Sequence, residues 1–212
     1  MMVGKFIAFE GGEGTGKSTQ ARLLVEYLQS QHIAAALTRE PGGTEGAEAI
    51  RGLLLDPPGD GWGARAEALL FAAARSDHVE KLIKPRIARD EWVICDRYLD
   101  SSRAYQGGAG GVGDDAVLSL HEVGSSGLRP DLTILINVPP ETVAERLAER
   151  DGDTSDAIGG RSAEYHAAVG TTFLDLAKGE PERFRVIDGD GTTADVHERV
   201  LSVLEPLLGK QA

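Results

Sequence analysis

The chain has 212 residues, a length that fits one α/β domain with a small insertion better than two full domains. Its 34 acidic side chains outnumber its 22 basic ones, and the net charge of −12 argues against DNA or an acidic membrane surface as the main partner. No apolar run approaches the roughly 20 residues that cross a bilayer, and the single cysteine, Cys95, cannot form an internal disulfide, so we expect a cytoplasmic protein.

The first half of the chain alternates between strand-like and helix-like patterns. An apolar run at 5–10 predicts a strand that leads directly into a glycine-rich loop, and apolar residues at helical spacing follow at 17–31. A second run, 34–40, ends at Pro41, which favours an extended conformation in the residue before it. A helix is predicted next, at about 45–55.

The same alternation continues to the end of the chain. A long helical pattern covers 64–89 and must bend or end near Pro85. Three further apolar runs predict strands and one pattern predicts a closing helix: 92–96, 131–137 and 184–188, then 193–208. Such alternation predicts an α/β fold with a five-stranded parallel sheet, helices on both faces and right-handed crossovers.

Two segments without regular patterning are candidates for a mobile lid. One is the glycine-rich stretch 106–115, and the other is the polar stretch 150–161. We expect a single domain over residues 1–212, with the lid at about 146–163.

The loop at 11–18 matches the pattern G-x-x-x-x-G-K-[ST] and lies where its mechanism requires, between a strand and a helix. Its glycines let backbone N–H groups surround phosphate oxygens, while Lys17 reaches the β- and γ-phosphates and Ser18 ligates Mg²⁺. A glycine-rich turn without nucleotide is the alternative, and the strand–helix context disfavours it. The predicted ATP-binding residues are Gly11, Gly12, Glu13, Gly14, Thr15, Gly16, Lys17, Ser18 and Thr19.

Asp96 ends the predicted third strand and is followed at once by Arg97. Ligands of open parallel sheets lie beyond the carboxyl ends of the strands, so Asp96 is expected to face the Mg²⁺ and the phosphates. A surface salt bridge between the two residues is the competing interpretation.

Four segments, in this order and at these separations, resemble the signatures of bacterial thymidylate kinases: FEGGEGTGKST (9–19), TREPGGT (38–44), LLFAAARSDH (69–78) and DRYLDSSRAYQG (96–107). The resemblance covers most of the chain. It implies a P-loop nucleoside monophosphate kinase fold and transfer of the γ-phosphate of ATP to dTMP, giving dTDP and ADP. It also implies a homodimer.

The resemblance assigns residues to the base and the sugar of dTMP. Phe71 and Arg75 lie four apart on one helix face, and they would stack on thymine and donate to a base carbonyl. Ser102 and Gln106 are assigned to the base, and Tyr105 would crowd the 2′ position and exclude ribose. Without the flanking motifs, Phe71 could equally be a core residue, and Asp100–Ser102 could be only a helix N-cap.

Arginines are expected to hold the acceptor's phosphate, because a guanidinium presents two parallel donors to phosphate oxygens. Arg97 and Arg51 are the main candidates, and Arg39 is a weaker one. The resemblance places Glu13 toward the sugar 3′-hydroxyl or a bound cation, and Glu40 near the acceptor pocket.

Phosphoryl transfer depends mainly on alignment and charge neutralisation, so Lys17, Arg97 and one lid arginine are the predicted catalytic residues. We favour Arg150 for the lid position over Arg161, with a solvated loop as the alternative for both. The Asp-Arg pair that the family carries in its lid is not recognisable in 153–160.

Two other functions compete with dTMP phosphorylation. Another nucleoside monophosphate kinase would use the same P-loop with the same Asp96 and Arg97. A nucleotide-dependent switch would bind the nucleotide without phosphorylating a small molecule, although the chain lacks the guanine-reading N-K-x-D element.

Overall fold

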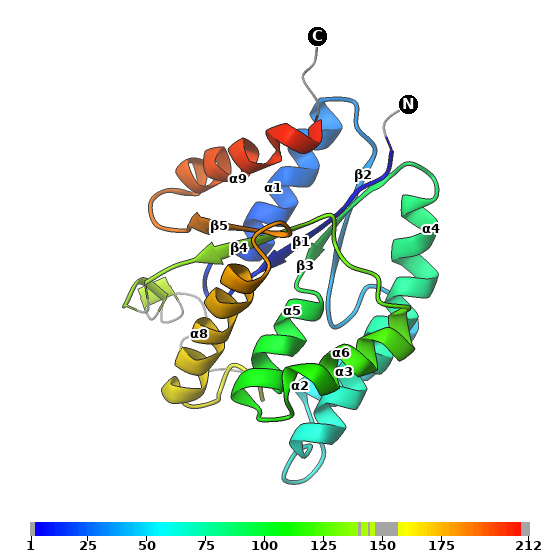
Figure 1. Cartoon of the computed structure of the whole chain (residues 1–212), viewed down its shortest axis with the longest axis vertical. Coiled ribbons are helices and arrows are strands. Elements are labelled where there is room, and N and C mark those ends of the chain that lie inside the picture. Colours follow the sequence, from blue (N-terminus) through cyan, green and yellow to red (C-terminus); the bar gives the residue numbers. More distant parts are fainter. Residues whose placement is uncertain (1–2, 140, 144, 147–156, 209–212) are drawn as a thin grey trace.

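In the computed structural model, which describes residues 3–139, 141–143, 145–146 and 157–208, five parallel strands form one sheet. The strand order is β2-β3-β1-β4-β5 (Figure 1). The strands are β1 (Phe6–Glu10), β2 (Ala35–Arg39), β3 (Trp92–Asp96), β4 (Leu132–Asn137) and β5 (Phe184–Asp188). The predicted α/β fold is therefore confirmed, with every predicted strand in place.

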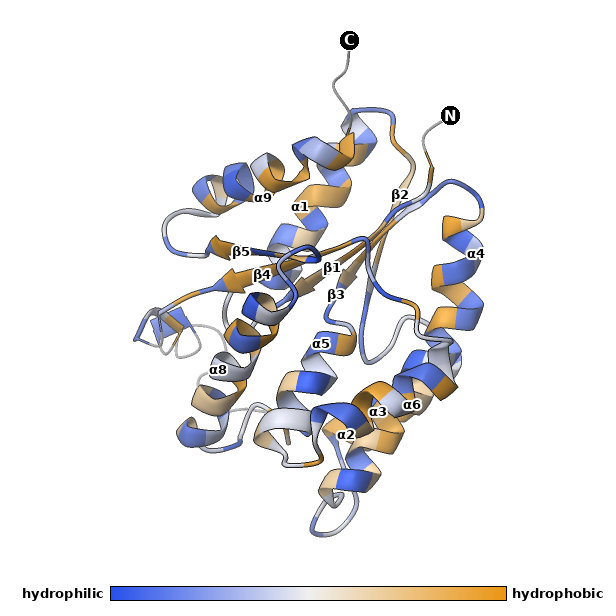
Figure 2. Cartoon of the chain, viewed as in Figure 1, coloured by the Kyte–Doolittle hydropathy of each residue, from blue (hydrophilic) through white to orange (hydrophobic). Residues whose placement is uncertain are grey.

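The central strand β1 shows why these strands read as continuous apolar runs. Ala8 is in register with Cys95 of β3 and with Thr133 of β4, so β1 has a neighbour on each side. Its alternate residues face opposite layers: Ile7 and Phe9 enter the core on one face, whereas Phe6 and Ala8 enter the core on the other. Figure 2 shows the result, a largely hydrophobic sheet between helices with mixed surfaces.

One face of the sheet is covered by α1 (Lys17–Ser30) and α9 (Thr193–Leu208) (Figure 1). Leu24 and Leu28 of α1 are buried, whereas Leu23 and Tyr27 are only partly buried. Within the described ranges, no helix combines the length and the apolar character that a bilayer crossing needs.

The other face is covered by a larger set of helices. These are α3 (Ala64–His78), the π-helical turn η1 (Val79–Ile83), α4 (Lys84–Ile87), α6 (Asp114–Ser125) and α8 (Ala163–Gly179), with α2 (Glu45–Leu55) packed on α3. The predicted interruption of the 64–89 helix is present, but it begins at Val79 rather than at Pro85. Pro85 lies in the first turn of α4, directly after the π-helical turn, so its missing N–H falls where the helical hydrogen-bond pattern has already changed.

The segment after β3 consists of α5 (Leu99–Ser102) and the π-helical η2 (Arg103–Ala109). Residues 106–115, a candidate lid without regular patterning in the sequence, are therefore helical in their first part. Gly108 permits close packing instead, because a Cβ there would overlap the hydroxyl of Thr172 on α8. The glycines bring η2 onto α8 and fix the wall of the site described next.

Candidate active site

The loop at 11–18 connects β1 to α1 at the carboxyl edge of the sheet. Gly11, Gly14 and Gly16 have φ angles of 141°, 68° and 92°, a region in which a Cβ is strained. None of the described side chains caps the N-terminus of α1, and its first turn carries no acidic residue. The first N–H groups of α1 are thus available to an anion, and the helix dipole favours negative charge there.

Lys17 lies over this loop with its side chain buried. Its Nζ donates to the carbonyl oxygen of Gly12 and lies 3.4 Å from Thr15 Oγ1. Burial lowers the pKa of Lys17 to about 8, and the charge of Arg97 adds to the effect, while Asp96 opposes it. A phosphate group beside Nζ would remove much of this penalty, so the position suits an anionic ligand.

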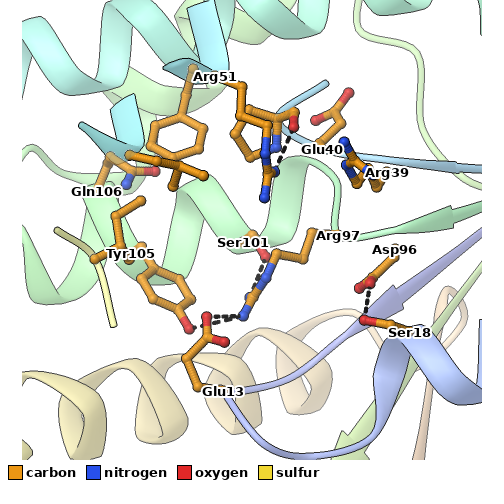
Figure 3. A pocket seen from close by; sticks show the side chains of 14 residues that line it. Glu13, Ser18, Arg39, Glu40, Arg51, Asp96, Arg97, Ser101, Tyr105 and Gln106 are labelled. Atoms are coloured by element: carbon orange, nitrogen blue, oxygen red, sulfur yellow. Dashed lines mark hydrogen bonds and ion pairs between the residues drawn. The ribbon is translucent and has the colours of Figure 1, made fainter. Parts of the chain in front are cut away.

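Asp96 and Ser18 meet at the edge of the loop. The Ser18 hydroxyl donates to Asp96 Oδ2 (Figure 3). The other oxygen, Oδ1, is buried, and no group in the described part of the chain donates to it. A hydroxyl beside an unpartnered carboxylate oxygen fits Mg²⁺, which prefers oxygen ligands. Among the described residues there is no group of three or more His, Cys, Asp or Glu that could hold a metal, so phosphate oxygens and water would complete the coordination.

Arg97 connects the loop to the neighbouring cavity. It has a φ of 66°, uncommon outside glycine, and its backbone N–H donates to Phe9 O at 2.9 Å. Its guanidinium donates to Gly11 O at 3.1 Å and to Glu13 Oε1 at 2.5 Å, and it lies 5.1 Å from the centre of the Tyr105 ring. Burial opposes the charge, but Tyr105 and the surrounding carboxylates raise the pKa, so Arg97 remains a cation.

A cavity of about 380 Å³ opens beside the loop, a size typical of small-molecule sites. Figure 3 shows charged side chains on several sides of it and the ring of Tyr105 on one. Its lining residues are Glu13, Ser18, Arg39, Glu40, Pro41, Arg51, Leu55, Phe71, Asp96, Arg97, Ser101, Tyr105, Gln106 and Ile158. The predicted acceptor residues all belong to this set except Arg75 and Ser102.

Arg75 and Ser102 lie directly behind the cavity wall, and both are buried. Arg75 Nε donates to Glu40 Oε2 at 2.7 Å, and its Nη2 donates to Ser102 Oγ at 2.8 Å and to Tyr98 O at 3.2 Å. Nη1 makes no hydrogen bond to any residue that the structure describes.

Glu40 is held on both of its carboxylate oxygens. Arg75 bonds Oε2, and His78 Nδ1 lies 3.0 Å from Oε1. The other ring nitrogen of His78, Nε2, lies 2.7 Å from Thr38 Oγ1. Burial alone would raise the pKa of Glu40, but Arg75 and His78 outweigh it, and the pKa is lowered. Glu40 is therefore a fixed anion that orients Arg75.

The predicted lid lies largely outside the described residues, and Arg150 is among those not described. Arg161 pairs with Glu67 and donates to the Tyr165 hydroxyl at 2.5 Å. Arg146 donates to Gly189 O at 3.1 Å. Neither of these two arginines lines the 380 Å³ cavity.

Glu10, Ser101 and Glu67 contribute to the site without having been predicted. Glu10 is buried at the end of β1 and accepts hydrogen bonds from Tyr98 N (2.8 Å), Ser101 N (3.1 Å) and Ser101 Oγ (2.6 Å). It therefore caps α5, a role that the sequence had suggested for Asp100–Ser102. Burial, helped by the nearby Asp100, raises the pKa of Glu10 to about 7. The signal available in the sequence was Glu10 itself, a single carboxylate at the end of an otherwise apolar strand.

Comparison with known proteins gives one consistent result. The family model described as thymidylate kinase matches residues 9–200. A thymidylate kinase of Rhizorhabdus wittichii is 50% identical over 98% of this chain and 100% of its own length, and one of Symbiobacterium thermophilum is 44% identical over 97% and 95%. The crystal structure of the thymidylate kinase from Ehrlichia chaffeensis is 34% identical, with a TM-score of 0.78, over 95% of this chain and 99% of that one.

Proposed function

This chain belongs to the thymidylate kinase family, and from that premise we propose that it transfers the γ-phosphate of ATP to dTMP with the residues of the loop and the adjoining cavity. The observation that carries the proposal is the contact between the two sites. Glu13 and Ser18 belong to the phosphate-binding loop and also line the cavity, and Arg97 bonds the loop at Gly11 while lining the same cavity. Donor and acceptor phosphates would therefore meet beside these residues.

ATP binds to the loop in this account. The N–H groups of the loop and of α1 surround its phosphates, and the Lys17 ammonium neutralises the β- and γ-phosphates. The binding residues are Gly11 to Thr19, as predicted from the sequence. Ser18 and Asp96 would hold Mg²⁺, which when bound neutralises charge on the phosphate oxygens.

The cavity takes dTMP. Phe71 stacks on thymine, Gln106 faces the base edge, and Arg97 and Arg51 bind the 5′-phosphate. Arg75 lies behind the wall and binds the base through Nη1. This nitrogen has no hydrogen-bond partner among the described residues and can donate to the O4 carbonyl. The remaining acceptor contacts are Glu13 at the sugar, Tyr105 at the 2′ position, and Glu40 and Ser102 as supports of Arg75.

A lid at about 146–163 supplies a further arginine to the transferred phosphate, and we assign this role to Arg150. What supports the assignment is that the two described lid arginines already bond protein groups: Arg161 bonds Glu67 and Tyr165, and Arg146 bonds Gly189. An arginine on the transferred phosphate is worth about 10³–10⁵ in rate.

The protein functions in this proposal as a cytoplasmic homodimer of single-domain chains. Three adjacent helices, α2, α3 and α6, each carry an exposed large apolar residue: Leu53, Leu69 and Val123. Exposed apolar residues on neighbouring helices support contact with a second copy. The single cysteine, Cys95, is buried and unbridged, as suits a reducing compartment.

A product assay distinguishes this function from its rivals. With ATP and Mg²⁺, we expect ADP to form only after dTMP is added, with one dTDP per ADP and no inorganic phosphate. Release of inorganic phosphate without an acceptor would instead support a nucleotide-dependent switch.

A further inference from the structure

Gln106 separates the 380 Å³ cavity from a second cavity of about 270 Å³, and it lines both. Its Nε2 donates to Glu67 Oε1 at 2.9 Å. Its Oε1 is buried, and no donor in the described part of the chain reaches it. Figure 3 shows the amide of Gln106 at the edge of the first cavity, above Tyr105. A buried acceptor without a donor at this edge awaits a hydrogen-bond donor from a ligand.

Glu67 is itself held from its other side. It is buried on α3, one turn before Phe71, and its Oε2 accepts from Arg161. Arg161 is fixed in turn by Tyr165, whose hydroxyl it bonds at 2.5 Å and whose ring centre lies 4.6 Å away. The Tyr165 hydroxyl donates to Tyr105 O at 2.7 Å. The Glu67 carboxylate is thus anchored on both oxygens.

The Glu67 carboxylate decides which end of the Gln106 amide faces the first cavity. The oxygen and nitrogen of an amide are nearly equal in size, so the surrounding donors and acceptors determine its orientation. An ionised carboxylate accepts hydrogen bonds and donates none. The NH₂ group of Gln106 must therefore face Glu67, which leaves the carbonyl oxygen for the cavity.

This orientation matters for pyrimidines. Thymine carries a donor, N3–H, at the position where cytosine carries an unprotonated acceptor, N3. A fixed carbonyl oxygen accepts a hydrogen bond from N3–H of thymine. With cytosine, a lone pair of the same oxygen faces the lone pair of N3, and the two repel each other.

We propose that Glu67 is a positioning residue that makes the kinase specific for N3–H pyrimidines by locking the Gln106 amide. The inference rests on the proposed binding of dTMP in the first cavity. Arg161, in this account, supports Glu67 rather than the transferred phosphate.

The test replaces Glu67 by its neutral isostere. In E67Q the side chain at position 67 can donate as well as accept, so the Gln106 amide can turn over. We expect the ratio of kcat/KM for dTMP to that for dCMP to fall at least about tenfold, a factor that corresponds to about 1.4 kcal/mol. The dTMP-to-dUMP ratio must stay unchanged, because both bases carry N3–H. KM for ATP must also stay unchanged.

A reciprocal exchange provides a rescue. In E67Q/Q106E the amide at position 67 accepts from Arg161 and donates to the carboxylate at position 106, whose second oxygen again faces the base as an acceptor. The dTMP-to-dCMP ratio is expected to recover. A merely structural role for Glu67 would make the double variant worse than either single one, and that result would overturn the inference.

Two further variants separate the possible failures. If Q106M keeps the wild-type dTMP-to-dCMP ratio, Gln106 does not read the base, and the proposed acceptor site itself is wrong. If Q106M loses discrimination while E67Q retains it, only the role of Glu67 is overturned. Should E67Q not fold, as checked by thermal melting, E67A gives the same test, because it also frees the amide and leaves room for water.

Discussion

Lys17 is buried over the loop at 11–18, and its pKa of about 8 lies well below that of an ordinary lysine. The side chain is charged below this pH and neutral above it. We therefore expect kcat/KM for ATP, which reports the free enzyme, to fall about tenfold per pH unit above pH 8. Bound phosphates stabilise the charged form of Lys17, so the fall in kcat should begin at a higher pH than the fall in kcat/KM. A common break in kcat and kcat/KM would contradict this role. As a control, K178M, which changes an exposed lysine on α8, should keep the pH dependence of the unmodified protein.

Phe71 lines the cavity without belonging to the hydrophobic clusters of the sheet. F71A should therefore weaken dTMP binding about tenfold or more, through lost stacking, and leave ATP binding unchanged. Titration calorimetry with each nucleotide measures this, with R65A as a control at an exposed position of the same helix. An equal loss for both ligands would identify Phe71 as a packing residue.

The proposed phosphate-binding residues could be predicted from the sequence because their chemistry is local. The loop from Gly11 to Ser18 is contiguous, and Asp96 closes a recognisable strand. Glu10 and Glu67 were missed because their partners, Ser101 and Gln106, lie 91 and 39 residues away, and no local pattern links them. For Glu67 a signal was available, since it lies four residues before Phe71 and shares its helix face.

At the scale of elements, the α5–η2 segment carries much of the cavity wall and is anchored by buried charges. Asp100, fully buried, bonds Arg183 at 2.6 and 2.9 Å and Arg103 at 3.1 Å. Arg103 also bonds Asp114 and Glu180. These contacts tie the segment to α6 and to the connection between α8 and β5, so this part of the cavity wall is held by residues that do not line the cavity.

Removing one charge from this cluster leaves its partners buried without enough opposite charge. D100N should lower the free energy of unfolding by roughly 3–5 kcal/mol, as breaking a buried ion pair does. Urea denaturation measures the change. D175N removes an exposed ion pair on α8 and should cost less than about 1 kcal/mol. Similar effects of the two substitutions would show that the Asp100 cluster contributes no more than a surface pair.

The helices and strands could be predicted from the sequence where the spacing of apolar side chains determines the type of element. The runs in β1 and β4 are apolar because both faces are covered. The π-helical turns were not predicted, because a shift in backbone hydrogen bonding leaves little trace in side-chain spacing. The packing role of Gly108 could not be predicted because only the tertiary structure places Thr172 against it.

At the scale of the whole molecule, the parallel sheet brings the two sites together. The carboxyl ends of β1 and β3 are neighbours, so the loop after one and Asp96–Arg97 after the other meet at one edge. Alternating elements alone predict that both segments lie at the carboxyl edge of the sheet, whereas the adjacency of β1 and β3 comes from the strand order of the structure. The position of Arg75 and Ser102 behind the wall could not be predicted, since it depends on how α3 and α5 pack.

The most direct test of the account is a phosphoacceptor panel. With ATP and Mg²⁺, kcat/KM is measured for dTMP, dCMP, dGMP and AMP. A cavity lined by Phe71 and Gln106, with Arg75 behind its wall, predicts that kcat/KM for dTMP greatly exceeds that for the other acceptors. Equal or greater activity with any other acceptor would contradict it.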